Sequence, residues 1–144
     1  MWENLFFSKS QKRKTKKQKM KEKGRRSYRK GQAFEKKVYP FLARKGYKVT
    51  KSRVRSKRRE EFDGLVTDKH RHTHGVEIKN TKLKVSAKVV KGLKKKVDRN
   101  RLLHSGVIVS KTGFTKDAEN EAKRSGIKLF KFKQKKKKND GWLF

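Results

Sequence analysis

Three residues near the middle of the chain have the side chains needed to hold a divalent cation against a phosphate. Asp63 lies in the segment EFDG, and Glu77 and Lys79 lie in the segment VEIK. Carboxylates are the ligands that Mg²⁺ and Mn²⁺ prefer, and such an ion is a Lewis acid for phosphodiester hydrolysis. A lysine beside the ion can stabilise charge that develops in the transition state. Asp63 and Glu77 are therefore the candidate ligands of Mg²⁺ or Mn²⁺, and Lys79 is the candidate catalytic cation.

A β-hairpin is needed to bring these three residues together. Side chains alternate between the two faces of a strand, so an inward-facing apolar set leaves the three polar residues on the opposite face. The strands are expected at residues 61–67 and 75–80, and a turn centred near residue 71 would put Asp63 opposite Lys79, with Glu77 on the diagonal. Diagonal neighbours are roughly 7–8 Å apart, within reach of a shared ion. The apolar residues expected to share the core face are Phe62, Val66, Val76 and Ile78.

In so basic a chain, the spacing acid-x-lysine does not by itself indicate a catalytic site. Glu35, Glu77 and Glu121 all have a lysine two residues later, and composition alone predicts about three such cases. Glu35 and Glu121 lie in helical patterns, where residues i and i+2 face different ways. Glu77 alone follows a hairpin arm that offers a second carboxylate. The alternative is a pair of structural carboxylates neutralised by neighbouring lysines, and the residues leave both readings open.

The overall charge indicates a polyanionic partner. The chain has 144 residues, 47 Lys and Arg, 13 Asp and Glu, and a net charge of +34. Such an excess is typical of proteins that bind nucleic acid. The chain has no cysteine, which favours an intracellular (cytoplasmic) location, and no apolar run near the roughly 20 residues of a membrane span, so no membrane partner is expected.

Periodicity predicts one folded domain between two basic tails. Residues 1–29 and 133–144 lack enough apolar side chains to form a core, so we expect them to be disordered without a partner. Residues 30–132 give a helix, three strands, a helix, a strand, a helix and a strand. The predicted fold class is therefore α/β, with a mixed central sheet flanked by helices in the order αβββαβαβ. Pro40 is expected to kink or divide the first helix.

The segments just described also resemble a known family. Glu35 in a first helix, followed by EFDG and VEIK, is similar to the PD-(D/E)xK nuclease superfamily, which has the restriction-endonuclease-like fold. The later segment GVIVSKTGFTKDAENEAKRSGIKLF resembles the end of the Mrr-type restriction endonuclease catalytic domain. The resemblance implies metal-dependent DNA cleavage, with Asp63 and Glu77 as metal ligands and Lys79 as catalytic lysine. It also implies that Glu35 orients water or aids a metal.

The resemblance covers about residues 30–131 and departs from the family pattern at two positions. Phe62 stands where the motif has proline, and Glu77 stands where Mrr proteins usually have glutamine. The glutamate is a feature shared with archaeal Holliday junction resolvases. A homodimer would let two active sites cut both strands of a duplex.

Two further groups of residues bear on binding. One face of the second predicted helix is basic and could follow a phosphate backbone; its residues are Lys88, Lys91, Lys95 and Arg99. His70, His72 and His74 alternate across the hairpin turn, where they could bind Zn²⁺, although no fourth ligand is evident and a solvated turn is the favoured reading.

The sequence therefore predicts a metal-dependent DNA endonuclease, either structure-selective or restriction-like. Nothing in the chain has the pattern of a base-reading motif. The rival hypothesis is a non-enzymatic nucleic-acid binder of the ribosomal or chromatin type, which would use the chain only as a cationic surface.

Overall fold

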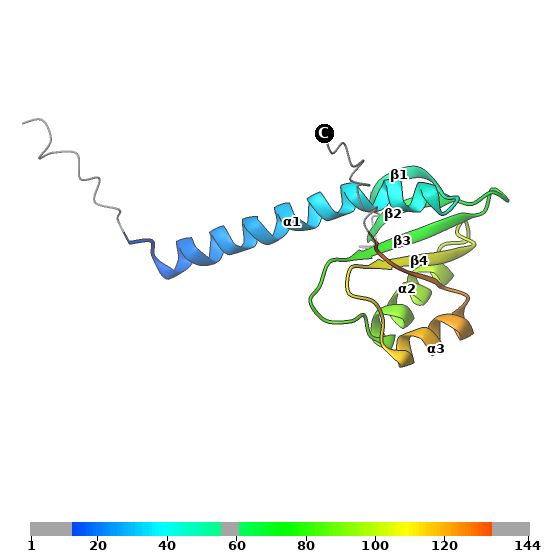
Figure 1. The fold of residues 1–144 in the computed structure, drawn as a ribbon. Coiled ribbons are helices and arrows are strands. Elements are labelled where there is room, and N and C mark those ends of the chain that lie inside the picture. The colour runs from blue at the N-terminus through cyan, green and yellow to red at the C-terminus, as the bar shows by residue number, and fades with distance from the viewer. Residues whose placement is uncertain (1–12, 56–60, 134–144) are drawn as a thin grey trace, which may run out of the picture. The chain divides into compact units, whose positions relative to one another are not determined.

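The computed structural model describes residues 13–55 and 61–133 of the chain. Within these residues there are three helices and five strands (Figure 1). In chain order they are α1 (Lys16–Arg44), β1 (Lys48–Arg55), β2 (Glu61–Thr67), β3 (Thr73–Lys79), α2 (Ala87–Arg99), β4 (Ser105–Ser110), α3 (Lys116–Ser125) and β5 (Lys128–Lys131). The predicted αβββαβαβ order and the α/β fold class are confirmed.

The five strands form one mixed sheet in the order β1-β2-β3-β4-β5. Strand β2 is antiparallel to both β1 and β3, whereas β4 is parallel to both β3 and β5. Parallel neighbours need a crossover connection, and α2 and α3 supply the two crossovers. The sheet thus combines an antiparallel hairpin, which carries the predicted acids, with a parallel half.

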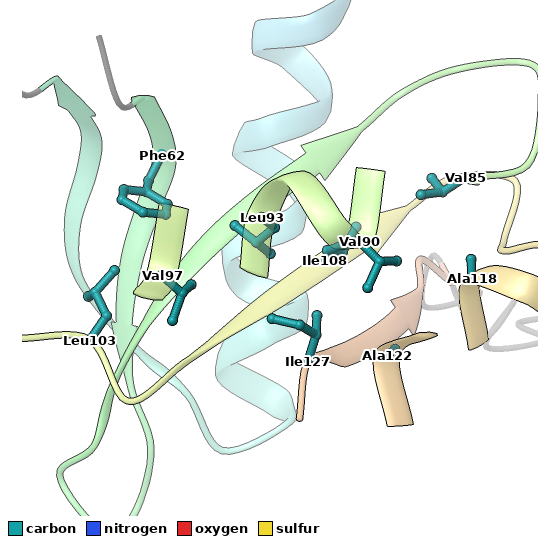
Figure 2. Close-up of a cluster of buried hydrophobic side chains, with 10 residues drawn as sticks. All are labelled: Phe62, Val85, Val90, Leu93, Val97, Leu103, Ile108, Ala118, Ala122 and Ile127. Carbon is teal, nitrogen blue, oxygen red and sulfur yellow. The ribbon is translucent and has the colours of Figure 1, made fainter. Parts of the chain in front are cut away.

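Both faces of the sheet are covered by apolar side chains. The C-terminal part of α1 contributes Phe34, Val38, Phe41 and Leu42 to one cluster, which also contains Val66, Val76, Val107 and Val109. On the other face α2 and α3 pack over a second cluster (Figure 2), formed by Phe62, Val85, Val90, Leu93, Val97, Leu103, Ile108, Ala118, Ala122 and Ile127. Strand β4 is buried on both faces, as its continuous apolar run predicts.

Phe62 does not share a core face with Val66 and Val76, and the prediction that it would is wrong. Its ring belongs to the cluster under α2 and occupies the space above Gly75, where an added Cβ would lie 2.6 Å from two ring carbons. Beyond Gly64, β2 pairs with β1 alone, with Phe62 opposite Val54, and the missing side chain of Gly75 leaves room for the Phe62 ring on the side of the sheet that α2 covers.

Helix α1 ends as the sequence predicts. Gly46 has a positive φ of 93°, and the backbone N–H of Tyr47 donates to the carbonyl oxygen of Leu42 at 3.1 Å, which closes the last turn. Pro40 does not divide the helix, which runs unbroken from Lys16 to Arg44. The proline ring is exposed, so the missing backbone hydrogen bond lies where water can replace it.

The N-terminal part of α1 differs from the predicted disorder. Residues 16–29 are helical, and the helix begins at a capping box in which Thr15 and Gln18 exchange side-chain to backbone hydrogen bonds at 2.9 and 3.2 Å. Lysine, arginine, glutamine and methionine are good helix formers, so a capped segment can extend a helix without burying an apolar face. The charge of the segment concealed this signal in the sequence.

The chain divides into two compact units, Met1–Ala33 and Phe34–Phe144, and α1 contributes residues to both. The predicted boundaries of the domain and its tails, at residues 29/30 and 132/133, remain predictions. The parts of the tails at residues 1–12 and 134–144 lie outside the described residues. Among the described helices, none combines the length and the apolar character that crossing a membrane requires.

Candidate active site

Asp63 lies where the pairing between β2 and β3 stops. The ladder runs from Thr67 opposite Thr73 to Gly64 opposite Val76, and Asp63 is the next residue of β2. Its carboxylate oxygen Oδ2 accepts a hydrogen bond of 2.7 Å from the backbone N–H of Ile78. The side chain of Asp63 therefore bridges to β3 at the point where the backbone ladder ends.

A second contact fixes the main chain of the same residue. The hydroxyl group of Tyr39, on α1, donates to the carbonyl oxygen of Asp63 at 2.7 Å. Asp63 is thus held by β3 through its carboxylate and by α1 through its carbonyl group. Sequence reasoning missed Tyr39, whose spacing of four residues from Glu35 is its only signal.

Glu77 and Lys79 project from the face of β3 that α2 and α3 cover. Glu77 is paired with Ile108 of β4, which belongs to the cluster under α2, and Lys79 is paired with Ser110. The Lys79 ammonium nitrogen lies 3.2 Å from Glu77 Oε1, and the two side chains are 34% and 18% exposed. A partly buried carboxylate and its lysine therefore stand at the edge of the apolar cluster.

The register of the hairpin differs from the predicted one. The pairing of Gly64 with Val76 centres the turn on residue 70, not near residue 71, so continuing it would put Asp63 opposite Glu77 and not opposite Lys79. The reason is the turn itself. Asp68 Oδ1 accepts from the backbone N–H groups of His70 and His72, and Arg71 takes a positive φ of 64°, which gives a three-residue loop.

The electrostatics of Asp63 show which charged groups surround it. Burial raises the pKa of Asp63, and the nearby Glu77 carboxylate raises it further, while the Ile78 N–H group, Lys79 and Lys96 lower it. Asp63, Glu77 and Lys79 thus act on one another, as the hairpin hypothesis requires. Lys96 of α2 is an additional cation at this site that sequence reasoning did not single out.

The carboxylates present suit a cation that keeps much of its water. Within the described part of the chain, no group of three or more His, Cys, Asp or Glu side chains could hold a metal ion. Mg²⁺ is usually bound by one or two carboxylates, with waters and substrate phosphates completing the octahedron. Asp63 and Glu77 fit that requirement, since they are two neighbouring carboxylates, and the pKa of Asp63 is raised by burial and, to a smaller extent, by Glu77.

The other predicted site residues lie at different places. Glu35 is half-buried on α1, one turn before Tyr39. The four basic residues of α2 are exposed and share the helix face opposite the buried Val90, Leu93 and Val97; they are Lys88, Lys91, Lys95 and Arg99. That stripe points away from the sheet, and it is Lys96, not a member of the stripe, that interacts with Asp63.

The histidines belong to the opposite end of the hairpin. Nε2 of His74 lies 2.8 Å from Asp68 Oδ2, and the ring of His72 stacks on that of His104 with centroids 4.1 Å apart and an interplanar angle of 12°. The hydrogen bond from His74 is the main reason why the pKa of Asp68 is lowered. The imidazole groups therefore support the turn through Asp68 and through ring stacking.

Comparison with known proteins gives a family and a fold. The family model of the Mrr catalytic domain, described as a restriction endonuclease, matches residues 28–134. A search of the curated proteins found no significant match. The matched segment contains all the residues of the candidate site and agrees with the family resemblance of the sequence motifs.

Several solved structures are similar to this chain. A repair endonuclease from Pyrococcus abyssi is 18% identical with a TM-score of 0.57, over 73% of this chain and 46% of that protein. A protein described as of unknown function is 19% identical with a TM-score of 0.53, over 69% and 56%. These likenesses show a common fold, and this chain spans about half the length of the solved proteins it matches.

Proposed function

Because this chain belongs to the restriction endonuclease family of Mrr catalytic domains, we propose that it is a metal-dependent DNA endonuclease with its reaction centre at Asp63, Glu77 and Lys79. The observation that carries the proposal is the end of the β2–β3 ladder. There the Asp63 carboxylate bridges to β3, next to the Glu77–Lys79 pair, and its raised pKa reflects both burial and the second carboxylate.

The two carboxylates have the role of cation ligands. Asp63 and Glu77 would hold one Mg²⁺ or Mn²⁺ ion, which when bound polarises a phosphoryl oxygen and lowers the pKa of a bound water. The Ile78 N–H group keeps Asp63 Oδ2 in place, while Oδ1 has no hydrogen bond among those between described residues. A carboxyl group with a raised pKa must lose its proton when a cation binds, so cation binding should release protons at a pH low enough for Asp63 to be partly protonated.

Lys79 has the role of the catalytic cation. Its ammonium group is 3.2 Å from Glu77 Oε1, and the lysine side chain is only one-third exposed, so the ammonium group is held beside the carboxylates. From there it can donate a hydrogen bond to the attacking water or to a phosphoryl oxygen as negative charge develops. In the reaction, water oxygen forms a bond to phosphorus and the bond from phosphorus to one sugar oxygen breaks. Glu35, one helical turn before Tyr39 on α1, is proposed to orient water or to aid the metal.

DNA would be bound through its phosphates. The stripe on α2 is exposed and contains four cations and no acid, so it can follow a phosphate backbone, and each contact adds to the salt dependence of binding. No base-reading pattern accompanies it, which supports selection of substrates by structure, such as branches or junctions. A homodimer would supply the second centre needed to cut both strands, and the proposed location is the cytoplasm, with the DNA.

The proposal is tested by incubating the purified full chain with supercoiled plasmid, linear duplex, branched DNA and a four-way junction. Parallel reactions contain Mg²⁺, Mn²⁺ or EDTA, and each is repeated with Asp63→Asn. We expect nicking that needs the cation and is lost in the variant, while binding of the same DNA is kept. If the parent protein binds every substrate but cleaves none with either cation, the chain is a non-enzymatic nucleic-acid binder.

A further inference from the structure

The exposed half of α1, residues 16–33, has no face that a protein core could cover. Every side chain from Lys16 to Lys30 is exposed apart from the half-buried Glu22, and its two large apolar residues, Met20 and Tyr28, are 67% and 58% exposed. A helix that is polar all round gains nothing from packing and must be stabilised in another way. Its role therefore has to be sought in its charge.

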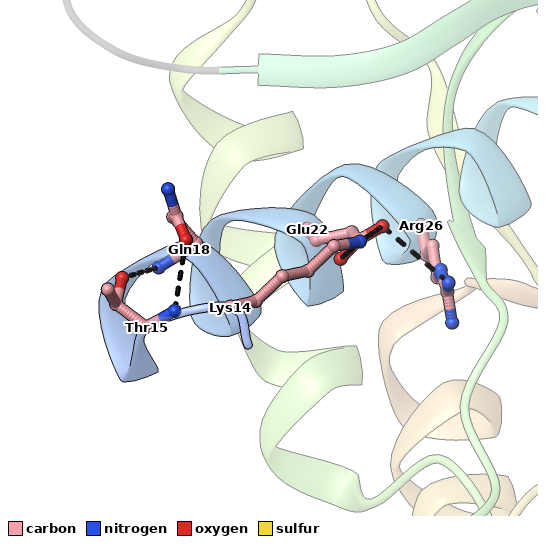
Figure 3. Close-up of polar contacts among 5 residues, drawn as sticks. All are labelled: Lys14, Thr15, Gln18, Glu22 and Arg26. Carbon is pink, nitrogen blue, oxygen red and sulfur yellow. Dashed lines mark hydrogen bonds and ion pairs between the residues drawn. The ribbon is translucent and has the colours of Figure 1, made fainter. Parts of the chain in front are cut away.

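That charge is almost entirely positive, and the repulsion between neighbouring cations destabilises the helix. The half-helix contains nine Lys and Arg and one acid, Glu22. Lys17, Lys21, Arg25 and Arg29 follow one another at intervals of four residues, which places like charges next to each other along one stripe. Glu22 is one acid among nine cations and can offset only a small part of this charge; its carboxylate lies 2.8 Å from Lys14 and 3.7 Å from Arg26, neither of which belongs to the stripe (Figure 3).

Two glycines weaken the same half-helix without a packing reason. An added Cβ at Gly24 or at Gly31 would meet no atom within 4 Å, so neither glycine is needed for a close approach among the described residues. Each lowers the helix–coil equilibrium about fivefold relative to alanine. The helix nevertheless has a specified beginning, since Thr15 and Gln18 form the reciprocal capping box (Figure 3).

We propose that residues 16–33 form a second DNA-binding surface, a basic helix that contacts the phosphates of duplex DNA and becomes more stable when they neutralise its charges. The inference rests on the proposed function for the choice of DNA as the polyanion. Phosphates beside the stripe would remove the repulsion between Lys17, Lys21, Arg25 and Arg29. A half-helix of 18 residues is about 27 Å long, so it can reach phosphates over several base pairs. Contacts of this kind add affinity without base specificity.

The binding test uses the full chain in EDTA, so that cleavage plays no part. The affinity for a labelled DNA duplex is measured over a range of salt concentrations for the parent and for the quadruple variant Lys17→Gln, Lys21→Gln, Arg25→Gln, Arg29→Gln. Glutamine is a good helix former, so the change removes charge and keeps helix propensity. If all four residues contact phosphates, the slope of log affinity against log salt falls by about 3.6. A change of less than about one would overturn the proposal.

The matched control removes the same charge elsewhere. Lys116, Lys123, Lys128 and Lys131 are exposed and lie outside α1, so their replacement by glutamine gives the same net charge. The control should lower the salt slope by much less than the α1 variant does. Equal slopes for the two variants would mean that total charge, and not this helix, is responsible. If the parent protein binds a labelled RNA duplex more tightly than DNA, and the α1 variant lowers the salt slope for RNA, the partner of this helix is RNA and not DNA.

The coupling between order and binding is tested with Gly24→Ala, Gly31→Ala, which leaves every charge in place. Because the free helix is then more populated, the double variant should have more helical circular dichroism without DNA and should bind the duplex several-fold more tightly. Unchanged affinity together with increased helicity would contradict the coupling. These outcomes differ from a failure of the nuclease proposal, which would appear as the absence of cation-dependent cleavage by the parent protein.

Discussion

The two ends of the β2–β3 hairpin shift the pKa of an aspartate in opposite directions. The carboxylate of Asp63, at the open end, accepts a hydrogen bond from the Ile78 N–H group, and its pKa is raised mainly by burial. Asp68, at the turn, accepts from two backbone N–H groups and lies 2.8 Å from Nε2 of His74, and its pKa is lowered mainly by that histidine. The two residues are five positions apart in the chain.

The difference separates a structural carboxylate from one that can take a ligand. Asp68 has its negative charge compensated by the groups that form the turn, and its contacts set the register of the whole hairpin. Asp63 is partly buried beside the Glu77 carboxylate, and its pKa stays raised, mainly by burial, although the Ile78 N–H group, Lys79 and Lys96 all lower it. A divalent cation would relieve the cost of the charged form, and nothing comparable remains to be relieved at Asp68.

The largest expected effect is on cleavage, and it should distinguish the two aspartates. Asp63→Asn should lower the rate of plasmid nicking on the order of a thousandfold, because it removes a ligand charge at the reaction centre. Asp68→Asn makes the same chemical change and should keep the rate within about twofold under conditions where the protein is folded. The measurement is the initial nicking rate at saturating Mg²⁺, with circular dichroism as the check of folding. Equal losses in both variants would abolish the distinction.

The next effect concerns two of the three lysines that follow a glutamate by two residues. Lys79→Ala should reduce cleavage about a hundredfold, because the ammonium group beside Glu77 is removed. Lys123→Ala, two residues after Glu121 on α3, should have almost no effect, since Glu121 pairs with Arg124 at 2.7 Å instead. Duplex affinity in EDTA, measured in parallel, should change little for either variant. A hundredfold loss for Lys123→Ala would contradict the assignment of Lys79 as the catalytic lysine on the ground that it lies on strand β3.

Local patterns in the sequence predicted the order of the helices and strands, but neither the N-terminal extent of α1 nor the contacts between the elements. Two elements are predicted correctly from their apolar patterns: the buried part of α1, from the helical spacing of Phe34, Val38, Phe41 and Leu42, and β4, from its apolar run. In both cases the residues that form the pattern are the ones that the fold buries. The turn was misplaced because its centre depends on which N–H groups the Asp68 side chain accepts. A stretch of alternating polar and apolar residues fits either register equally well.

The site was only partly visible for a similar reason. Asp63 and Glu77 could be paired because a hairpin brings its own arms together. Lys96 could not be told from Lys95 or Lys91, since which lysine of α2 reaches Asp63 depends on how the helix packs on the sheet. At the start of α1, Thr15 and Gln18 form a capping box, but the many charged residues around them led to a prediction of disorder.

Lys96 provides a smaller and more specific test of the open end. Lys96→Gln should reduce cleavage about tenfold at most and should move the acid limb of the pH–rate profile to higher pH. The sign follows from Asp63, because Lys96 lowers its pKa, so removing Lys96 raises that pKa and a cation must displace the proton at higher pH. Lys95→Gln is the matched control on the exposed side of α2. It should weaken DNA binding at most and leave the limb in place; a shift of the limb in the control would contradict the assignment.

The smallest expected effect is on thermal stability in EDTA, and here the two aspartates should differ in sign. The folded-state pKa of Asp63 is raised, so its stabilising contribution exists at low pH and is lost as pH rises through that pKa. At neutral pH the charged group opposes folding, and Asp63→Asn, which still accepts from Ile78, should raise the melting temperature by a few degrees.

Asp68 has a lowered folded-state pKa, so its contribution is present above its ordinary value of 3.8 and is lost only as pH falls below it. Asp68→Asn should therefore lower the melting temperature at pH 7 and still lower it at pH 5, whereas the gain from Asp63→Asn should become smaller as the pH is lowered. Melting curves of the two variants and the parent at both values give four differences. Shifts of the same sign at pH 7 would mean that the two carboxylates have equivalent environments, and the contrast between the two ends of the hairpin would fail.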